Sequence, residues 1–138
     1  MVYETFEHTA DLGLRVRAIS LRQLFEDAAK GLFSMLVVNL DDVGHVHEKT
    51  YAIDGAELDY LLFDWLSELL YTFETENLLL SSFKVELQDD GLQAICLGEP
   101  VDPSRHVMDH EVKAITYHAL RTEQQEDGSW LAELIVDI

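Results

Sequence analysis

Acidic residues occur near both ends of this chain, and each could bind a cation. Near the amino end, the polar run His8-Thr9-Ala10-Asp11 lies where one predicted strand turns into the next. At the other end, the β-prone run 130–138 finishes on Asp137 and Ile138, so the strand should fix the Asp137 side chain beside the terminal carboxylate. Like charges held close together repel each other unless a cation neutralises them. The sequence therefore predicts a positive partner at Asp137.

Two interpretations of the amino-terminal run stay open on the sequence alone. Thr and Asp side chains often bond to nearby backbone at a strand-to-strand turn, which would make the run purely structural. In the functional interpretation, Asp11 is an oxygen ligand of a hard cation, and His8 is a second ligand or a residue that orients one. Carboxylate and carbonyl oxygens suit an ion such as Ca²⁺ better than they suit metals that prefer sulfur.

A second group of polar residues lies in a predicted loop over residues 98–112, which contains two prolines. The members of this group are Glu99, Asp102, Arg105 and His106, and the exit of the loop carries Glu111, Lys113 and His118. Function often concentrates in loops held on a rigid scaffold, but charged loops are also simply solvated. These residues form a candidate polar site and no more on this evidence.

Several familiar catalytic patterns are missing from the sequence. There is no His-Glu-x-x-His zinc motif, no Gly-x-Ser-x-Gly nucleophile motif and no glycine-rich phosphate loop. The single cysteine, Cys96, lies in an apolar run, which predicts a buried and inert thiol and no intrachain disulfide.

The charge balance limits the partners that the chain could bind. Nine Lys and Arg residues against 27 Asp and Glu residues give a net charge of −18. Such a surface repels nucleic-acid phosphates and anionic lipid, so work on RNA would need a basic partner protein. The acidity could equally serve only solubility. The start of the chain lacks the features of a signal peptide, and no uncharged apolar run approaches the ~18 residues of a membrane span, so we expect a cytoplasmic protein.

Hydrophobic periodicity predicts the elements that must position these residues. In chain order they are a strand over 12–18, a helix over 21–36 capped by Ser20 and Gln23, a strand over 46–53, a helix over 58–73 capped by Asp54 and Glu57, and two hairpins over 83–97 and 114–138. Strands joined by hairpins form an antiparallel sheet, and two amphipathic helices can cover one of its faces. We therefore predict a single α+β domain over residues 1–138.

Taken in order, the motifs of the whole chain resemble those of the archease family. The matching segments are His8-Thr9-Ala10-Asp11 with Gly13, the helical runs 24–33 and 65–71, Gly98-Glu99 with Asp102 and Arg105-His106, Glu111 to His118, and the final Asp137-Ile138. The octapeptide from Glu111 to His118 together with the two ends is the most specific part of this resemblance. Leu12 stands where an Ile is common, which conserves volume.

The resemblance implies a non-catalytic accessory protein of the RtcB-type RNA ligase, which acts in tRNA splicing and RNA repair. Proteins of this family are understood to promote guanylylation of the ligase, to support its multiple turnover and to broaden its nucleotide use. The resemblance also implies a divalent cation, usually Ca²⁺, held by Asp11, Asp137 and Ile138. Lys113 is similar in placement to a lysine suspected of acting in activation, and His8, Glu99, Arg105 and His106 are candidates for activation or for supporting the ligands.

Two other functions remain as alternatives. A metal-dependent hydrolase could use Asp11 and Asp137 around a catalytic ion, although the sequence offers no general base at a recognisable spacing. A general chaperone or adaptor could use its acidic surface to bind basic clients.

Overall fold

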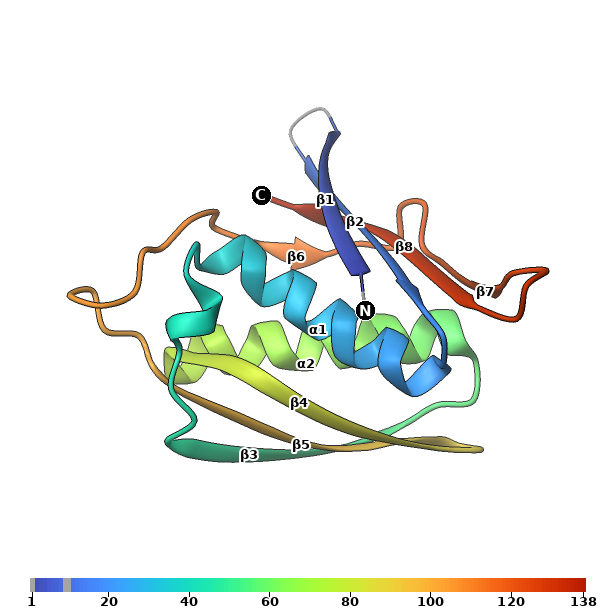
Figure 1. The fold of residues 1–138 in the computed structure, drawn as a ribbon, viewed down its shortest axis with the longest axis horizontal. Coiled ribbons are helices and arrows are strands. Elements are labelled where there is room, and N and C mark those ends of the chain that lie inside the picture. Colours follow the sequence, from blue (N-terminus) through green and yellow to red (C-terminus); the bar gives the residue numbers. More distant parts are fainter. Residues whose placement is uncertain (1, 9–10) are drawn as a thin grey trace.

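The computed structural model describes residues 2–8 and 11–138, which form two antiparallel sheets with a layer of helices between them (Figure 1). The first sheet contains β1 (Val2–His8), β2 (Asp11–Ala18), β6 (Ala114–Ile115), β7 (Arg121–Gln124) and β8 (Trp130–Asp137). The second sheet contains β3 (His47–Asp54), β4 (Leu78–Gln88) and β5 (Gly91–Pro100). The helices are α1 (Leu21–Leu36) and α2 (Leu58–Glu76), and a short 3₁₀ helix, η1, spans Leu40–Asp42. The predicted α+β class, with antiparallel hairpins and two helices, is confirmed.

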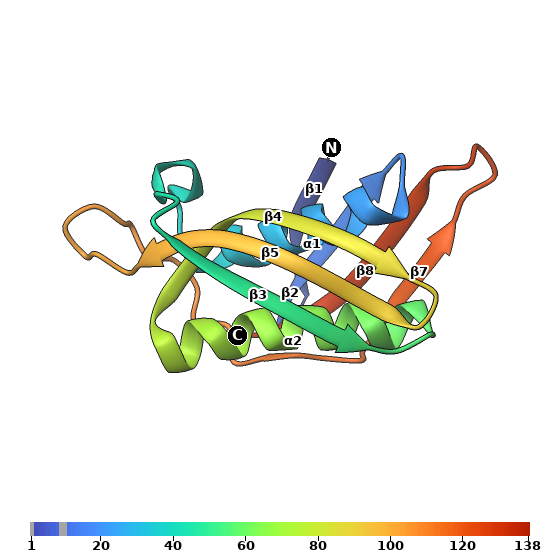
Figure 2. The ribbon, with the colours of Figure 1, turned by 90° about the horizontal axis from the view of Figure 1, so that it is seen from below.

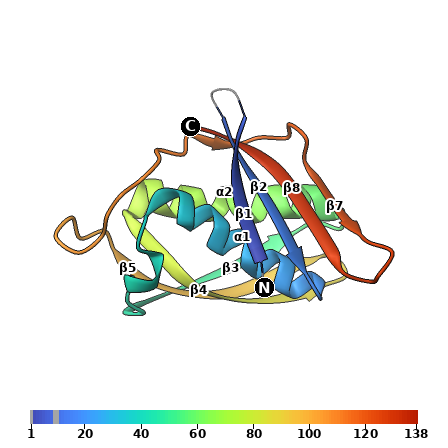
Figure 3. The ribbon, with the colours of Figure 1, turned by 45° about the horizontal axis from the view of Figure 1, so that its top comes forward.

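The strands divide into two sheets, whereas the sequence predicted one sheet with both helices on a single face. The first sheet has the order β1-β2-β8-β6, with β7 also paired to β8, and it lies across one side of the helices (Figure 3). The second sheet has the order β3-β5-β4 and covers the other side (Figure 2). The reason lies in α1, whose buried residues occupy most of its circumference, so that one sheet cannot cover them all.

The start of α1 follows the predicted capping. The Ser20 hydroxyl accepts a hydrogen bond from the backbone N–H of Gln23 at 3.2 Å. The side chains of Leu24, Phe25 and Leu32 are then fully buried between the two sheets. Capping and hydrophobic spacing together fix this helix in the middle of the molecule.

The start of α2 differs from the prediction. Asp54 does not cap the helix, because it is the last residue of β3 and pairs with Gly91 of β5. The residue before the helix is Glu57, whose side chain makes no capping hydrogen bond. The left-handed Asn77, with φ of 54°, ends the helix as a typical carboxyl-terminal cap.

The second predicted hairpin is interrupted on one side. Instead of the one continuous strand that a hairpin over 114–138 requires before its turn, the chain forms β6 and then β7, both paired to β8. Between them Ala119 has φ of 56°, and the N–H of Leu120 donates to the carbonyl of Tyr117 at 3.2 Å. This turn takes Tyr117 off the sheet and places its ring on Phe63 of α2.

One hydrophobic core joins the two sheets through the helix layer. Trp65 of α2 is fully buried, and its indole N–H donates to the carbonyl of Phe25 in α1 at 3.0 Å. Within the described residues, neither helix has the length and apolar character needed to cross a membrane.

Candidate functional site

The register of β2 and β8 places Asp11 directly opposite Asp137. The next pair along, Leu12 and Val136, is buried against the helices, so the two aspartates lie on the outer face of the sheet. Residues directly opposite in an antiparallel pair have Cβ atoms about 4.5–5.5 Å apart. The structure thus brings together two carboxylates that lie near opposite ends of the sequence.

Three further predicted residues lie at the same place, which we call the Asp11–Asp137 end. The backbone N–H of Lys113 donates to the carbonyl of Asp137 at 2.7 Å, and its side chain is exposed. Ile138 follows Asp137 and packs partly against the core. His8 pairs with Asp11 through the backbone register of β1 and β2. The His8 side chain, Thr9 and Ala10 lie outside the described part of the chain.

The oxygen atoms available at this end are of the type that a hard cation binds. Asp11 and Asp137 offer carboxylate oxygens, the ligand that Ca²⁺ prefers. Directly opposed like charges also destabilise an antiparallel pair, so a cation between them would relieve an unfavourable contact. Among the residues whose side chains the structure describes, no three His, Cys, Asp or Glu residues gather as a metal-binding group. Other oxygens would have to complete the coordination of such an ion.

The outer face beside the Asp11–Asp137 end contains an aromatic residue that the sequence analysis missed. The ring of Phe6 lies directly on Gly13, where an added Cβ would come within 2.1 Å of the ring. This contact explains the glycine in the motif, since only a residue without a side chain leaves room for the ring. An aromatic residue opposite a strand glycine was the available sequence signal.

Arg15, two residues beyond Gly13 on the same face, is engaged by its own partners. Its side chain donates to Glu4 at 2.9 Å and to Glu133 at 2.7 Å, and its guanidinium lies 4.9 Å from the centre of the Phe6 ring. The hydrogen bonds to Glu4 and Glu133 raise the pKa of Arg15 above its usual value. Arg15 therefore links β1, β2 and β8 through its side chain.

The loop residues predicted as a polar site form a separate group, the Glu99 cluster, at the end of β5 and in the loop that follows it. The carboxylate of Glu99 accepts hydrogen bonds from the backbone N–H of Gly44 and from Arg105 Nη1, the latter at 2.8 Å. It also lies 3.3 Å from Nε2 of His106. The bond from Gly44 is the main reason that the pKa of Glu99 lies below its usual value, and His106 and Arg105 add to it.

The tautomer of His106 follows from its other hydrogen bond. This side chain is buried, and its Nδ1 accepts the backbone N–H of Asp102 at 2.8 Å. A ring nitrogen that accepts carries no proton, so the proton of the neutral ring is on Nε2 and points to Glu99. Each polar group of the cluster has a partner, and the cluster fastens the loop after β5 to Gly44.

The structure does not place Glu99, Arg105 and His106 with Asp11 and Asp137. Glu99 belongs to β5 in the second sheet, on the other side of the helix layer from β2 and β8. Cys96, also in β5, is fully buried, and burial raises the pKa of its thiol to about 12. This agrees with the prediction of an inert cysteine, since the thiolate is the reactive form.

Comparison with known proteins identifies the family. Residues 3–138 match the model of the "Archease protein family (MTH1598/TM1083)". The chain is 40% identical over 140 residues to the protein archease of Pyrococcus furiosus, covering 99% of this chain and 98% of that one. It is 41% identical over 142 residues to the protein archease of Methanopyrus kandleri, covering 100% of both chains.

Solved structures agree with this assignment. The solution structure of Methanobacterium thermoautotrophicum protein 1598 superposes with a TM-score of 0.86 at 35% identity, over 99% of this chain and 98% of that one. The crystal structure of an archease from Thermotoga maritima, described as a possible chaperone, has a TM-score of 0.69 at 18% identity. It covers 100% of this chain and 98% of the other, and at that identity it shows the fold alone. Sequence match, fold and full-length coverage together show that this chain belongs to the archease family.

Proposed function

We propose that this chain is a cation-binding accessory protein that activates an RtcB-type RNA ligase and has no turnover of its own. In this proposal it promotes guanylylation and multiple turnover of the ligase, broadens its nucleotide use and acts in the cytoplasm. The observation that carries the proposal is the register that sets Asp11 opposite Asp137, with the backbone of Lys113 bonded to Asp137. Family membership supports the choice of partner.

Asp11 and Asp137 would hold the cation, with a further oxygen from Ile138. A bound Ca²⁺ would neutralise the two carboxylates and link β2 to β8, which couples cation binding to the stability of the first sheet. Lys113 would remain exposed next to this place and could reach a group on the ligase.

The charge of the chain supports action through a protein. With a net charge of −18, the surface repels an RNA backbone, but it complements the basic surface that an RNA-handling enzyme needs. The ligase, and not this chain, would therefore contact the nucleic acid.

The test is a guanylylation assay with the host's ligase, GTP and Ca²⁺, in which formation of the ligase–GMP adduct and multiple-turnover ligation are followed. Wild-type chain should increase both, and Asp137→Ala should abolish most of the increase while the protein stays folded. Asp89→Ala is the matched control, because Asp89 is an exposed aspartate in the turn between β4 and β5.

Other results of these assays would contradict the proposal or favour a different function. If wild-type chain leaves the ligase unchanged, the proposal fails. Suppression of aggregation of unrelated proteins, without dependence on Asp11, would indicate a general chaperone. Turnover of phosphoesters by the isolated chain, lost in Asp137→Ala, would indicate a metal-dependent hydrolase.

A further inference from the structure

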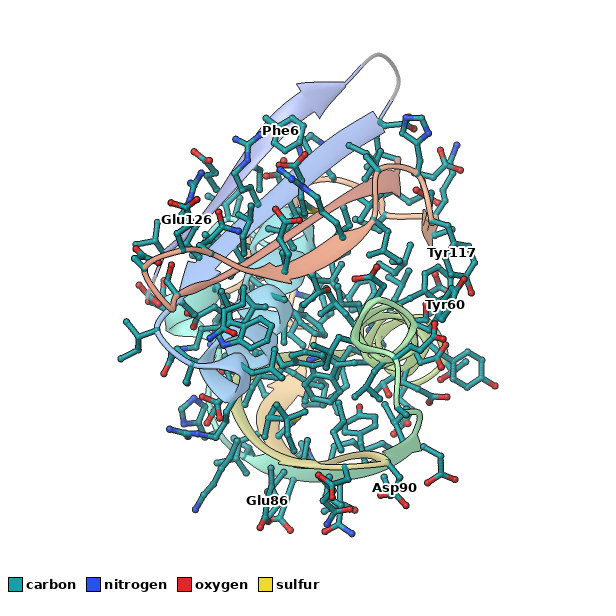
Figure 4. All side chains as sticks on the ribbon, turned by 90° about the vertical axis from the view of Figure 1, so that its right-hand side faces the viewer. Phe6, Tyr60, Glu86, Asp90, Tyr117 and Glu126 are labelled. Carbon is teal, nitrogen blue, oxygen red and sulfur yellow. The ribbon has the colours of Figure 1, made fainter. Side chains whose placement is uncertain are left out.

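A second surface feature lies away from the Glu99 cluster, between the first turn of α2 and the turn that separates β6 from β7. It is an open pocket of 710 Å³. Its acidic and polar lining comes from Glu57, Asp59 and Thr122, and its aromatic lining from Tyr60 and Tyr117. Figure 4 shows Tyr60 and Tyr117 close together at the surface of the molecule.

The two tyrosines of the pocket, Tyr60 and Tyr117, are largely exposed. Tyr117 is 58% exposed although one face of its ring stacks on Phe63, with the ring centres 3.9 Å apart. Tyr60 is 55% exposed and meets Tyr117 edge to face at 5.9 Å. Two large rings in contact at the surface offer a face for a planar or cationic group.

Two polar atoms at the pocket also lack partners. Oδ1 of Asp59 and Oγ1 of Thr122 are covered, yet neither makes a hydrogen bond within the described part of the chain. Covered polar atoms without partners are unfavourable, so a ligand that donates hydrogen bonds would be stabilised here. Both residues are half-buried and both line the pocket.

The charges around the pocket favour a cation. Glu57 and Asp59 are acidic, and none of the described residues that line the pocket is basic. The whole chain has the same sign, with a net charge of −18. Acidic oxygens beside exposed aromatic rings match the side chain of arginine, which is planar, stacks on rings and donates several hydrogen bonds.

We propose that this pocket receives an arginine side chain of the partner protein. The guanidinium donates to the carboxylate of Asp59 and lies against the Tyr60–Tyr117 pair. This inference rests on the proposed function, for which it supplies a docking point. The chain from Lys113 through β6 to Tyr117 runs directly from the Asp11–Asp137 end to the pocket, so a partner bound at the pocket lies along the segment that carries Lys113.

The first experiment measures binding of the host's ligase to the wild-type chain and to Asp59→Asn and Tyr117→Leu. The Leu variant keeps apolar bulk over Phe63, and amide spectra check that both variants fold. Each should bind the ligase about tenfold more weakly, as expected for loss of one charged hydrogen bond or one cation–ring contact. Asp64→Asn and Tyr71→Leu, exposed residues further along α2, are the matched controls and should bind like wild type.

The outcomes separate this inference from the proposed function. If the wild-type chain binds and activates the ligase and the pocket variants match the controls, the arginine pocket is wrong while the proposed function stands. If the wild-type chain neither binds nor activates the ligase, the proposed function fails.

A second measurement decides the pocket without the ligase. Nα-acetyl-arginine amide, titrated into the wild-type chain, should shift the amide resonances of residues 57–60 and 117–122 more than the lysine analogue does. Asp59→Asn should reduce those shifts. Equal shifts with both analogues, or none at these residues, would overturn the inference.

Discussion

In the Glu99 cluster one carboxylate is surrounded by donors, whereas at the Asp11–Asp137 end two carboxylates are set against each other by strand register. Glu99 accepts from Gly44 and Arg105 and faces the Nε2–H of His106. Asp11 and Asp137 are neighbours because the pairing of β2 with β8 places them opposite each other.

The difference separates a structural group from a candidate binding site. A buried carboxylate with hydrogen bonds and an arginine beside it has its partners within the protein, so it stabilises a loop without needing a ligand. Two opposed aspartates on an outer sheet face raise the local negative potential, and a cation from outside can lower it. Polar residues of similar appearance in sequence therefore have different surroundings in the fold.

The largest effect is expected at the Glu99 cluster from His106→Leu. This substitution leaves the N–H of Asp102 without its acceptor and removes the donor to Glu99, which should cost about 2–3 kcal/mol of unfolding free energy. Urea denaturation measures the loss. His110→Leu is the control, because His110 is an exposed histidine in the same loop and should cost far less. Equal losses in the two variants would mean that the cluster does not fasten the loop.

An intermediate effect is expected from pH, again through Glu99. Its pKa is below the ordinary value of 4.5, so its contribution to stability is complete above about pH 4.5 and is lost as the pH falls through the lower pKa of the folded state. Wild-type Tm should therefore fall more steeply below this pH than the Tm of Glu99→Gln, which starts lower at neutral pH.

The control for the pH experiment is Glu86→Gln, an exposed position on β4. Its Tm profile should follow that of the wild-type chain, because Glu99 and its hydrogen bonds are kept. Parallel profiles for wild type and Glu99→Gln would contradict the role given to the hydrogen bonds of Glu99.

The smallest effect on stability is expected from Asp137→Asn in the absence of divalent cations. Removing one of two opposed charges should stabilise the chain slightly, by about 0.2–1 kcal/mol. Addition of CaCl₂ should then raise the Tm of the wild-type chain but not that of the variant, as thermal unfolding would show. Asp89→Asn should respond to Ca²⁺ like wild type. An equal rise in all three proteins would place cation binding elsewhere.

Sequence patterns predicted the parts of the fold that depend on neighbouring residues. The alternation over 12–18 and the Ser20 cap are found as predicted, because each depends on contacts a few residues apart. The division into two sheets was not predictable, since periodicity shows that a face is apolar and not which strands will cover it. The break near Ala119 was also missed, because alanine gives no signal for a positive φ.

The residues of the candidate site were likewise predictable only in part. The convergence of Asp11 and Asp137 was inferred from the resemblance and from the β-prone run at 130–138, and the register now places the two residues opposite each other. The role of the Glu99 cluster could not be predicted, because its decisive partner is the backbone N–H of Gly44, which has no sequence signature. Phe6 was missed because its contact with Gly13 depends on the register of β1 and β2, which the sequence analysis did not assign.

The strand order of the first sheet also sets the time at which the candidate site can exist during synthesis. The second sheet and both helices are complete by Pro100, but β2 must wait for β8, which begins only at Trp130. Until then Asp11 has no strand on that side of β2. A nascent or interrupted chain can thus fold much of its core while lacking the paired aspartates, so cation binding would report that synthesis has passed β8.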